Sequence, residues 1–541
     1  MKIKELYIPV FPLDESISGH DLYIVDHINL TGSSPRNIGF IPVTELYCSK
    51  NSSVKQSSKA TPIKVAALAH GEHPNSEEKE ILLKHGVQAY SYDLIPLALN
   101  YCAEGYTLDA KAYIPKTPKN YSLTGFHTGI KAFSKANNFD LGIIYSTEPC
   151  LWAGVFTKNA MKAACVETNM QLLNKKVYGI IANSGNANCC NGDLGLDSDH
   201  ELKALLKNFL RDKYKLLETE ASEQALEVLS ASTGVIGRTL DLSLPKKQFQ
   251  IAMDTYLSKA ASGPLDDIYN FAKAIMTTDL VPKIAQDKNQ HFLGISKGSG
   301  MIAPNMATML AFIISDVKID GLDEKETQLF MQKTLNEITN ETFNNISVDG
   351  DTSTNDMVLL LNNLSGESIS ASEFKSSLRE VCEKLSYQII ADGEGLTKII
   401  DLELIDLPLS KTNLQKIGKN IINSMLVKTA IFGSDPNWGR IVAAFAREED
   451  LLVKEKTPEK RLGMEEIEVY LLDQCVFKNA TAQLFGEDLD SLSKLMKSSR
   501  HINIRVQLAD KPKTTEHLYS ARFLGNDLSY DYVKINAEYT S

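Results

Sequence analysis

The chain has 541 residues, with 57 lysines and arginines against 68 aspartates and glutamates, which gives a formal net charge of −11. This length predicts more than one domain, because single hydrophobic cores stop growing at about 250–300 residues. A composition of 43% hydrophobic and 23% charged residues is that of a globular protein and excludes a disordered one. The acidic balance argues against a nucleic-acid-binding protein, which needs clustered lysine and arginine. Small anionic ligands are not excluded, because local charge can oppose net charge.

The chain also lacks the patterns of a membrane or secreted protein. No apolar run approaches the roughly 18–20 residues of a membrane span. The first residues, MKIKELYIPVFPLDES, are interrupted by Pro9 and Pro12 and predict neither a secretory signal nor a transit peptide. The eight cysteines are sparse and form no CxxC pair, which is typical of a reducing compartment. These features predict a cytoplasmic, multi-domain protein.

Two breaks in the pattern divide the first part of the chain. A polar stretch over 52–64 predicts a loop. A second break, IPKTPKNYSLTGFHTG over 114–129, carries two prolines and two glycines. We place a domain boundary there, near residue 116.

Beyond residue 129, short apolar runs alternate with amphipathic stretches. The runs at 141–145 and 178–182 predict strands, and the stretch over 324–343 predicts a helix. One face of that helix carries apolar residues at i, i+4 and i+7, namely Met331, Leu335 and Ile338. Mixed strands and helices predict an α/β or α+β fold, and propensity alone does not choose between the two.

The most informative stretch is KGSGMIAPNMATMLAFIISDV, over 297–317. A Gly-Ser-Gly turn passes through Pro304 and Asn305 into an apolar run that predicts a buried strand, and Thr308 stands at the junction. The glycines lack the GxxxxGK[ST] spacing of a phosphate-binding loop, so we reject that interpretation. Taken alone, Thr308 would more often be the end of a structural loop that leads into a core strand.

The longer string KGSGMIAPNMATML resembles the self-processing site of the ornithine acetyltransferase (glutamate N-acetyltransferase) family of arginine biosynthesis. Eight further segments resemble the same family in the same order, and the resemblance covers about residues 120–541. The segments are GVFTKNAMKAACV (154–166), IIANSGNANCCNG (180–192), SASTGVIGR (230–238), AIMTTDLVPK (274–283), VDGDTSTND (348–356), DGEGLTK (392–398), LVKTAIFGSDPNWGRI (426–441) and DLSYDYVKINAEY (527–539).

The resemblance implies that the chain cuts itself between Ala307 and Thr308, leaving an α chain, 1–307, whose acetyltransferase region is 116–307, and a β chain, 308–541. It implies an αββα-type sandwich with a smaller C-terminal region. Cleavage would make Thr308 an N-terminal nucleophile. Its free α-amino group, with an ordinary pKa of about 7.7–8.0, could then serve as the base for its own hydroxyl.

Further site residues come from the same resemblance. Thr233 and Gly234 match the pair that stabilises the oxyanion, a task in which one donor is worth about 3–4 kcal/mol. The positions that match substrate-binding residues are Thr277, Lys297, Thr308, Glu394, Asn536 and Ser541. Thr278 is an alternative to Thr277, and Ser541 stands where the family usually has threonine. As isolated residues, Lys297 and Glu394 would more often be surface charges.

The implied reaction moves an acetyl group from N-acetylornithine to glutamate through an acetyl-Thr308 ester, with no metal or organic cofactor. The two chains would stay together in a heterotetramer, and the sequence leaves open whether acetyl-CoA also serves as donor. The family usually has a longer segment between Thr277 and Lys297, so we expect a changed acceptor side of the pocket. The alternatives are an amidase or aminopeptidase of the same self-processing kind, and an unprocessed binding protein.

Residues 1–115 lie outside this resemblance. Two segments, DLYIVDHINLTGSSP (21–35) and EEKEILLKHGVQAYSYDLIPLAL (77–99), resemble the nucleoside phosphorylase family in the right order. The phosphate-binding glycine loop of that family is not visible. We therefore expect a small N-terminal α/β module, similar to a phosphorylase fragment, without phosphorolysis activity.

Overall fold

The computed structural model of the chain describes residues 48–49, 107–108, 115–131, 139–214, 226–258, 264–302, 309–510 and 517–538. The polar stretch 52–64 and most of the expected module 1–115 lie outside the described residues. Within that module, strands β1 (Cys48–Ser49) and β2 (Thr107–Leu108) pair antiparallel.

The first of two packed sheets is built around the N-terminal part of a long strand, β4 (Leu141–Phe156). β3 (Tyr121–Phe126) and β5 (Val177–Asn186) flank it, both antiparallel. β6 (Leu229–Val235) adds to β5 in parallel. The expected strands at 141–145 and 178–182 are therefore confirmed, and the break over 114–129 contains a strand, β3.

The second sheet uses the C-terminal half of the same β4 as its edge. Its order is β7 (Lys283–Gln286), β8 (Phe292–Lys297), β9 (Leu310–Ser315), β12 (Met357–Asn362) and then β4. β9 and β12 run parallel and the other neighbours are antiparallel. The pairing of β4 shifts between Tyr145 and Cys150, where the strand passes from one sheet to the other.

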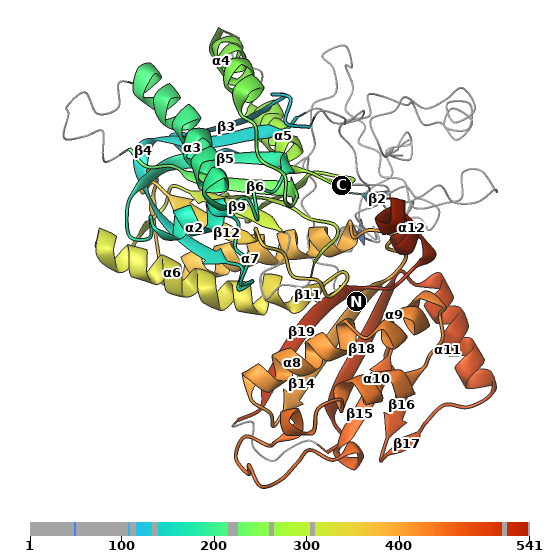
Figure 1. Ribbon diagram of the computed structural model, residues 1–541. Coiled ribbons are helices and arrows are strands. Elements are labelled where there is room, and N and C mark those ends of the chain that lie inside the picture. The colour runs from blue at the N-terminus through green and yellow to red at the C-terminus, as the bar shows by residue number, and fades with distance from the viewer. Residues whose placement is uncertain are drawn as a thin grey trace, which may run out of the picture.

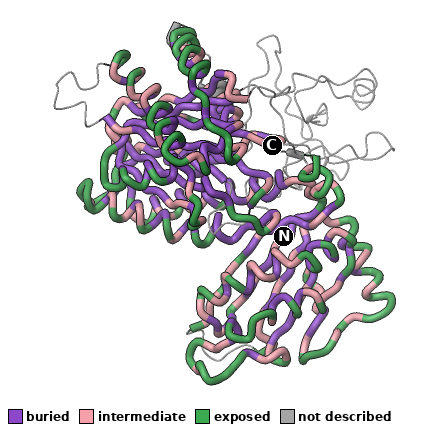
Figure 2. The backbone as a smooth tube through the Cα atoms, viewed as in Figure 1, coloured by how far each residue is buried: buried purple, intermediate pink, exposed green. Residues whose placement is uncertain are grey.

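Strict alternation along the strands shows that these sheets form the two inner layers of a sandwich. In β9, Leu310, Phe312 and Ile314 belong to the core between the sheets, whereas Ala311 and Ile313 belong to the core under the outer helices. Successive side chains of a strand point to opposite faces, so both faces of β9 are buried. Figure 2 shows the buried backbone concentrated in these layers.

Helices cover the outer face of each sheet (Figure 1). α3 (Gly192–Tyr214) and α4 (Ser243–Ser258) pack on the first sheet, and α6 (Glu324–Glu341) and α7 (Ala371–Ala391) on the second. α2 (Ala164–Met170) and α5 (Pro264–Ile275) contribute to the core between the sheets. The layers are thus helix, sheet, sheet, helix, and the expected αββα-type sandwich is confirmed.

α6 also confirms the expected amphipathic helix, with a small correction at its end. Met331, Leu335 and Ile338 are fully buried on one face. Asp323 caps the first turn, where its side chain accepts the Glu326 N–H and the Glu326 side chain returns to the Asp323 N–H. The α-helix ends at Glu341, and a short 3-10 turn, η3 (Phe343–Asn345), follows it.

A smaller C-terminal region forms a second lobe below the sandwich in Figure 1. Its seven-stranded sheet follows the order β11-β19-β14-β18-β15-β16-β17. The strands are β11 (Ile346–Ser347), β14 (Ile399–Leu407), β15 (Ile467–Leu471), β16 (Gln474–Lys478), β17 (Thr481–Ala482), β18 (His501–Leu508) and β19 (Tyr519–Asn526). Helices α8 (Lys411–Ile422), α9 (Met425–Phe432), α10 (Trp438–Phe445) and α11 (Glu487–Ser498) share its core.

The remaining described elements are short. β10 (Lys318–Ile319) pairs in parallel with β13 (Ser368–Ile369). Two 3-10 turns, η4 (Glu449–Leu452) and η5 (Met464–Glu466), lie in the C-terminal lobe, and α12 (Tyr530–Glu538) follows β19. Among the described residues, no helix combines the length and apolar composition needed to cross a bilayer.

Candidate functional site

Lys297 is the centre of a polar cluster formed where strands β6 and β8 end. Its ammonium Nζ donates hydrogen bonds to the hydroxyl oxygens of Thr277 at 2.8 Å and Thr233 at 3.3 Å. Lys297 is only 2% exposed. Three of the expected site residues, from three separate sequence segments, therefore meet at one buried point.

The cation of Lys297 is only partly neutralised by its surroundings. Burial lowers the pKa of Lys297, while the charges of Asp279, Asp356 and Glu394 act in the opposite direction. No described carboxylate lies within 4.0 Å of its ammonium. A buried ammonium with two hydroxyl partners can accept the carboxylate of a ligand, because buried charges need a partner of opposite sign.

Gly234 follows Thr233 in a conformation that requires glycine. Its φ is +132°, and a Cβ at this position would lie 2.4 Å from the carbonyl carbon of Gly185 on the neighbouring strand. Any side chain would therefore separate β5 from β6 at this point. The backbone around Thr233 and Gly234 is held in a close-packed strand end, which is suitable for presenting fixed hydrogen-bond donors.

A buried ion network holds the segment that carries Thr277. The Lys283 ammonium lies 2.7 Å from the Asp279 carboxylate and 2.6 Å from the Asp392 carboxylate. All three side chains are fully buried. Asp279 also accepts the backbone N–H groups of Thr277 at 3.0 Å and Gly298 at 2.6 Å. The network thereby fixes the backbone on both sides of the Lys297–Thr277 contact.

Burial and the neighbouring charges shift the pKa values of all three groups in this network. Although burial opposes ionisation, Lys283 and Lys297 hold the pKa of Asp279 far below its ordinary value. Burial raises the pKa of Asp392 to about 6, with Lys283 opposing the rise and Asp279 adding to it. Burial likewise opposes the charge of Lys283, but the two carboxylates raise its pKa.

A second pair of expected residues meets beside the 298–300 loop. The Asn536 amide donates to the Glu394 carboxylate at 2.9 Å, and the Glu394 backbone N–H donates to the Ser299 carbonyl at 2.8 Å. A Cβ on Gly300 would lie 2.2 Å from Glu394 Oε2, so the carboxylate lies against the glycine loop. Glu394 is partly exposed and Asn536 exposed, which leaves this pair accessible to a ligand.

The structure separates the two neighbouring threonines. Thr277 accepts the hydrogen bond from Lys297, whereas the Thr278 hydroxyl lies 2.8 Å from the Ser299 hydroxyl. Geometry thus favours Thr277 as the residue that shares a ligand with Lys297.

The segment that contains Ala307 and Thr308 lies outside the described residues, as does Ser541. Its two flanks are described, and a carboxylate holds each of them. Asp349 accepts the N–H groups of Met301 at 2.6 Å and Ile302 at 2.9 Å, and Asp356 accepts the N–H of Met309 at 2.9 Å. The chain therefore enters and leaves this segment at fixed points.

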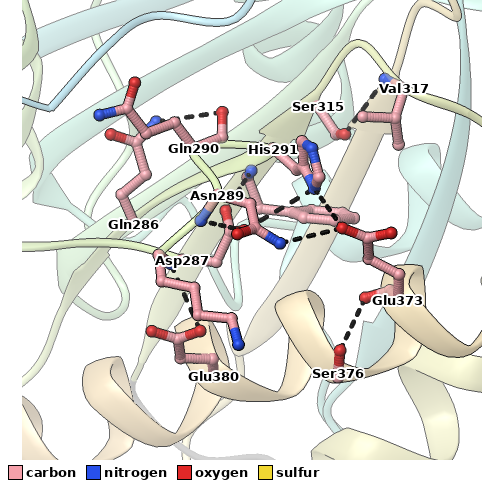
Figure 3. Close-up of polar contacts among 12 residues, drawn as sticks. Gln286, Asp287, Asn289, Gln290, His291, Ser315, Val317, Glu373, Ser376 and Glu380 are labelled. Atoms are coloured by element: carbon pink, nitrogen blue, oxygen red, sulfur yellow. Dashed lines mark hydrogen bonds and ion pairs between the residues drawn. The ribbon is translucent and has the colours of Figure 1, made fainter. Parts of the chain in front are cut away.

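The segment between Thr277 and Lys297 includes the β7–β8 hairpin, whose turn lies at the far end of β8. Figure 3 shows the turn, where Asn289 donates to Glu373 at 2.9 Å. In the same turn the buried Asp287 accepts the Phe292 N–H at 2.8 Å. Five residue steps along β8 separate Phe292 from Lys297, about 17 Å at 3.3 Å per residue. The turn is therefore remote from the Lys297 cluster.

The sequence reasoning did not single out three carboxyl groups that organise the site, namely Asp279, Asp349 and Asp356. Each belongs to a segment that resembles the family, AIMTTDLVPK or VDGDTSTND. Asp279 and Asp356 accept backbone N–H groups at or next to expected site residues, whereas Asp349 accepts those of Met301 and Ile302. In the sequence, an aspartate beside threonine, asparagine or glycine is typical of an ordinary turn, and only the backbone N–H groups that these three accept in the folded chain distinguish them.

Comparisons with known proteins agree with the order of the motifs. The ArgJ family model matches residues 122–541. The arginine biosynthesis bifunctional protein ArgJ of Bacillus anthracis is 37% identical over 440 residues, which covers 78% of this chain and 96% of that protein. The protein of the same name from Bacillus subtilis (strain 168) is 37% identical over 443 residues, covering 78% and 95%.

Two solved structures also match parts of the chain. The crystal structure of the arginine biosynthesis bifunctional protein argJ from Bacillus halodurans is 33% identical, covers 42% of this chain and 99% of that chain, and has a TM-score of 0.34. The ornithine acetyltransferase of Mycobacterium tuberculosis, complexed with ornithine, is 28% identical, covers 35% and 93%, and has a TM-score of 0.28.

Proposed function

The chain belongs to the ArgJ family and is an acetyltransferase of arginine biosynthesis, and we propose that it moves the acetyl group from N-acetylornithine to glutamate on the hydroxyl of Thr308. The observation that carries the proposal is the buried Lys297 ammonium, held by the hydroxyls of Thr277 and Thr233 and lacking a carboxylate partner among the described residues.

Both substrates are α-amino acid derivatives, and the two parts of the site suit their charged ends. Lys297 and Thr277 offer a cation and a hydroxyl donor to a substrate carboxylate. Glu394, oriented by Asn536 at 2.9 Å, offers a carboxylate to an ammonium group. Ser541 is the remaining proposed contact, carried by the resemblance of the C-terminal segment.

In the proposed chemistry, cleavage of the Ala307–Thr308 bond frees the α-amino group of Thr308. That amine accepts the hydroxyl proton while Oγ attacks the acetyl carbon of N-acetylornithine. The amide C–N bond then breaks, and ornithine leaves with the proton. The amine of glutamate attacks the acetyl-Thr308 ester in the same way and regenerates the hydroxyl. Thr233 and Gly234 would stabilise the oxyanion of each tetrahedral intermediate.

The sheet arrangement supports two chains that stay together after cleavage. β9 starts two residues after Thr308 and pairs with β8 of the preceding region on one side and with β12 on the other. Its side chains are buried on both faces, so separating the chains would expose a central strand. Further assembly into a heterotetramer, and acetyl-CoA as a second donor, are proposals that rest on the family. The sparse cysteines support our proposal that the enzyme is cytoplasmic.

The first test is the intact mass of the purified chain under denaturing conditions. Division of 59.8 kDa in proportion to 307 and 234 residues predicts fragments of about 34 and about 26 kDa, the smaller beginning at Thr308. Thr308→Ala should stay at full length and show no transfer. A single full-length species of the wild-type chain, or a processed and active Thr308→Ala variant, would overturn the proposal.

The second test identifies the acyl acceptor. Incubation of the processed enzyme with acetyl-labelled N-acetylornithine and glutamate should give labelled N-acetylglutamate. Release of free acetate without transfer would instead identify an amidase of the same self-processing kind. Replacement of the donor by labelled acetyl-CoA tests the second donor in the same assay.

A further inference from the structure

Two adjacent cysteines, Cys189 and Cys190, bring their thiols together on the loop that follows β5. Their Sγ atoms lie 3.6 Å apart. Neighbouring side chains of an extended chain point to opposite faces, so adjacent thiols meet only where the backbone turns. Asn188 and Cys190 supply that turn, because both have a left-handed φ, +48° and +61°, which residues other than glycine rarely adopt. The loop thus keeps two thiols in contact although two of its residues adopt unfavourable backbone conformations.

The two thiols differ in their surroundings. Cys190 is exposed, the only exposed one among the six cysteines whose placement the structure describes. Cys189 is 1% exposed, and its thiol donates to the Met161 carbonyl at 3.8 Å. Burial raises the pKa of Cys189, a hydrogen bond with Thr354 opposes the rise, and the neighbouring Cys190 adds to it. Cys190 is therefore the sulfur that a reagent in solution reaches first.

The backbone of this loop is joined to the end of β6, the strand that carries the expected oxyanion-stabilising residues. The Ala187 N–H donates to the Val235 carbonyl, and the Gly237 N–H donates to the Cys189 carbonyl, both at 3.0 Å. These two bonds continue the pairing of β5 with β6 past Gly234. A displacement of the Cys189 carbonyl therefore pulls on the residues that directly follow Gly234.

We propose that Cys189 and Cys190 form a thiol–disulfide exchange site, which a low-molecular-weight disulfide such as glutathione disulfide oxidises to a disulfide between the two residues. We propose further that this oxidation lowers acetyl transfer, because it displaces the end of β6. The second part rests on the proposed function, which gives Thr233 and Gly234 the task of stabilising the oxyanion. The first part does not depend on the reaction that the enzyme performs.

The exchange takes two steps. The Cys190 thiolate attacks one sulfur of glutathione disulfide, so that a mixed disulfide forms and one glutathione thiolate leaves. The Cys189 thiol then loses its proton, and its sulfur attacks the Cys190 sulfur and expels the second glutathione thiolate. The two protein thiols are oxidised to one disulfide, and glutathione disulfide is reduced to two thiols, which take up the two protons.

The geometry predicts that this disulfide is labile. Adjacent Cα atoms are about 3.8 Å apart, closer than the roughly 4.4–6.8 Å that most disulfides span. The two Sγ atoms must also move from 3.6 Å to bonding distance, which takes the Cys189 thiol away from the Met161 carbonyl. Disulfides closed under strain are readily reduced, as labile and regulatory disulfides are. A thiol reductant should therefore restore the reduced pair.

The test treats the full-length protein with glutathione disulfide, blocks the remaining thiols with iodoacetamide and digests the chain with trypsin. The tryptic peptide 177–203 contains Cys189 and Cys190 and no other cysteine. We expect this peptide to escape alkylation and to be lighter than the reduced peptide by two hydrogen atoms. In the same sample, kcat for acetyl transfer should fall about 10-fold or more and recover after dithiothreitol.

Two variants separate this pair from the other cysteines. Cys190→Ser removes the exposed thiol, so it should transfer acetyl groups at the wild-type rate and resist glutathione disulfide. Cys475→Ser is the matched control. Cys475 is partly exposed and lies on β16 in the C-terminal lobe, where its thiol donates to the Phe477 carbonyl at 3.7 Å. This variant should keep the wild-type sensitivity and give the same oxidised peptide.

The proposal is wrong if the treated peptide 177–203 is alkylated at both cysteines or keeps a stable glutathione adduct. It is also wrong if the disulfide forms without a loss of transfer, or if Cys190→Ser loses transfer as the wild type does. Failure of the proposed function gives a different result, because the untreated wild-type chain then shows no acetyl transfer. The peptide mass needs no substrate, so in that case it still decides whether the exchange site exists.

Discussion

His501 lies at the contact between the two lobes and should make the stability of the protein depend on pH. On β18 of the C-terminal lobe, its ring stacks on Tyr387 of α7 with centroids 5.9 Å apart, and its Nε2 lies 2.9 Å from the Tyr387 hydroxyl. Burial lowers the pKa of His501 from 6.5 to about 4, with Arg500 and Arg522 adding to the fall and Asp401 opposing it. The folded protein therefore holds this histidine neutral.

The direction in which stability changes with pH follows from the lower pKa of His501 in the folded state. Between pH 6.5 and 4 the unfolded chain binds a proton that the folded chain does not, so stability falls as pH falls through this window. At pH 4.5 the loss from His501 alone is about 2.5 kcal/mol, at 1.36 kcal/mol per pKa unit. In His501→Phe an aromatic ring still stacks on Tyr387, but the hydrogen bond to the Tyr387 hydroxyl is lost. That loss lowers the free energy of unfolding by about 1 kcal/mol at any pH.

Together, the protonation of His501 and the loss of its hydrogen bond predict that the wild type is the more stable protein at neutral pH and His501→Phe the more stable one at low pH. Near pH 7, His501→Phe should be less stable than the wild type by about 1 kcal/mol, and at pH 4.5 more stable by about 1.5 kcal/mol. Denaturant unfolding of both proteins, followed by fluorescence at pH 7, 5.5 and 4.5, measures the difference. Carboxylates that titrate in both proteins cancel in this comparison. A variant that is less stable by the same amount at every pH would refute the reasoning.

The other predictions concern the site directly. Lys283→Met leaves two buried carboxylates without their shared cation and should destabilise the protein by about 3–5 kcal/mol, measured by chemical unfolding at neutral pH. Gly234→Ala should lower kcat more than about tenfold, because its Cβ meets a neighbouring strand at 2.4 Å, whereas Gly237→Ala, which also has a positive φ but open space, should stay active. Glu394→Gln should leave cleavage intact and raise KM, and unchanged kinetics would remove Glu394 from the site.

Local patterns were sufficient to predict several elements. The α6 helix could be read from its apolar face and from Asp323, whose capping contacts involve residues within one turn. The buried strand after Thr308 followed from the continuous apolar run of β9. The strand β3 was hidden in the break 114–129, because its Pro- and Gly-rich surroundings resemble a loop. Its pairing with β4 is a tertiary contact that local propensity does not contain.

For the candidate site, too, the sequence determined some properties and the fold determined others. The amino-acid sequence by itself determined the family and the identity of the expected site residues, because the motifs recur in order along three quarters of the chain. Only the tertiary structure decided that Lys297 is buried against Thr233 and Thr277, and that Thr277 rather than Thr278 faces it. These properties depend on strands whose partners lie tens of residues apart, so they arise only when the sheets have packed.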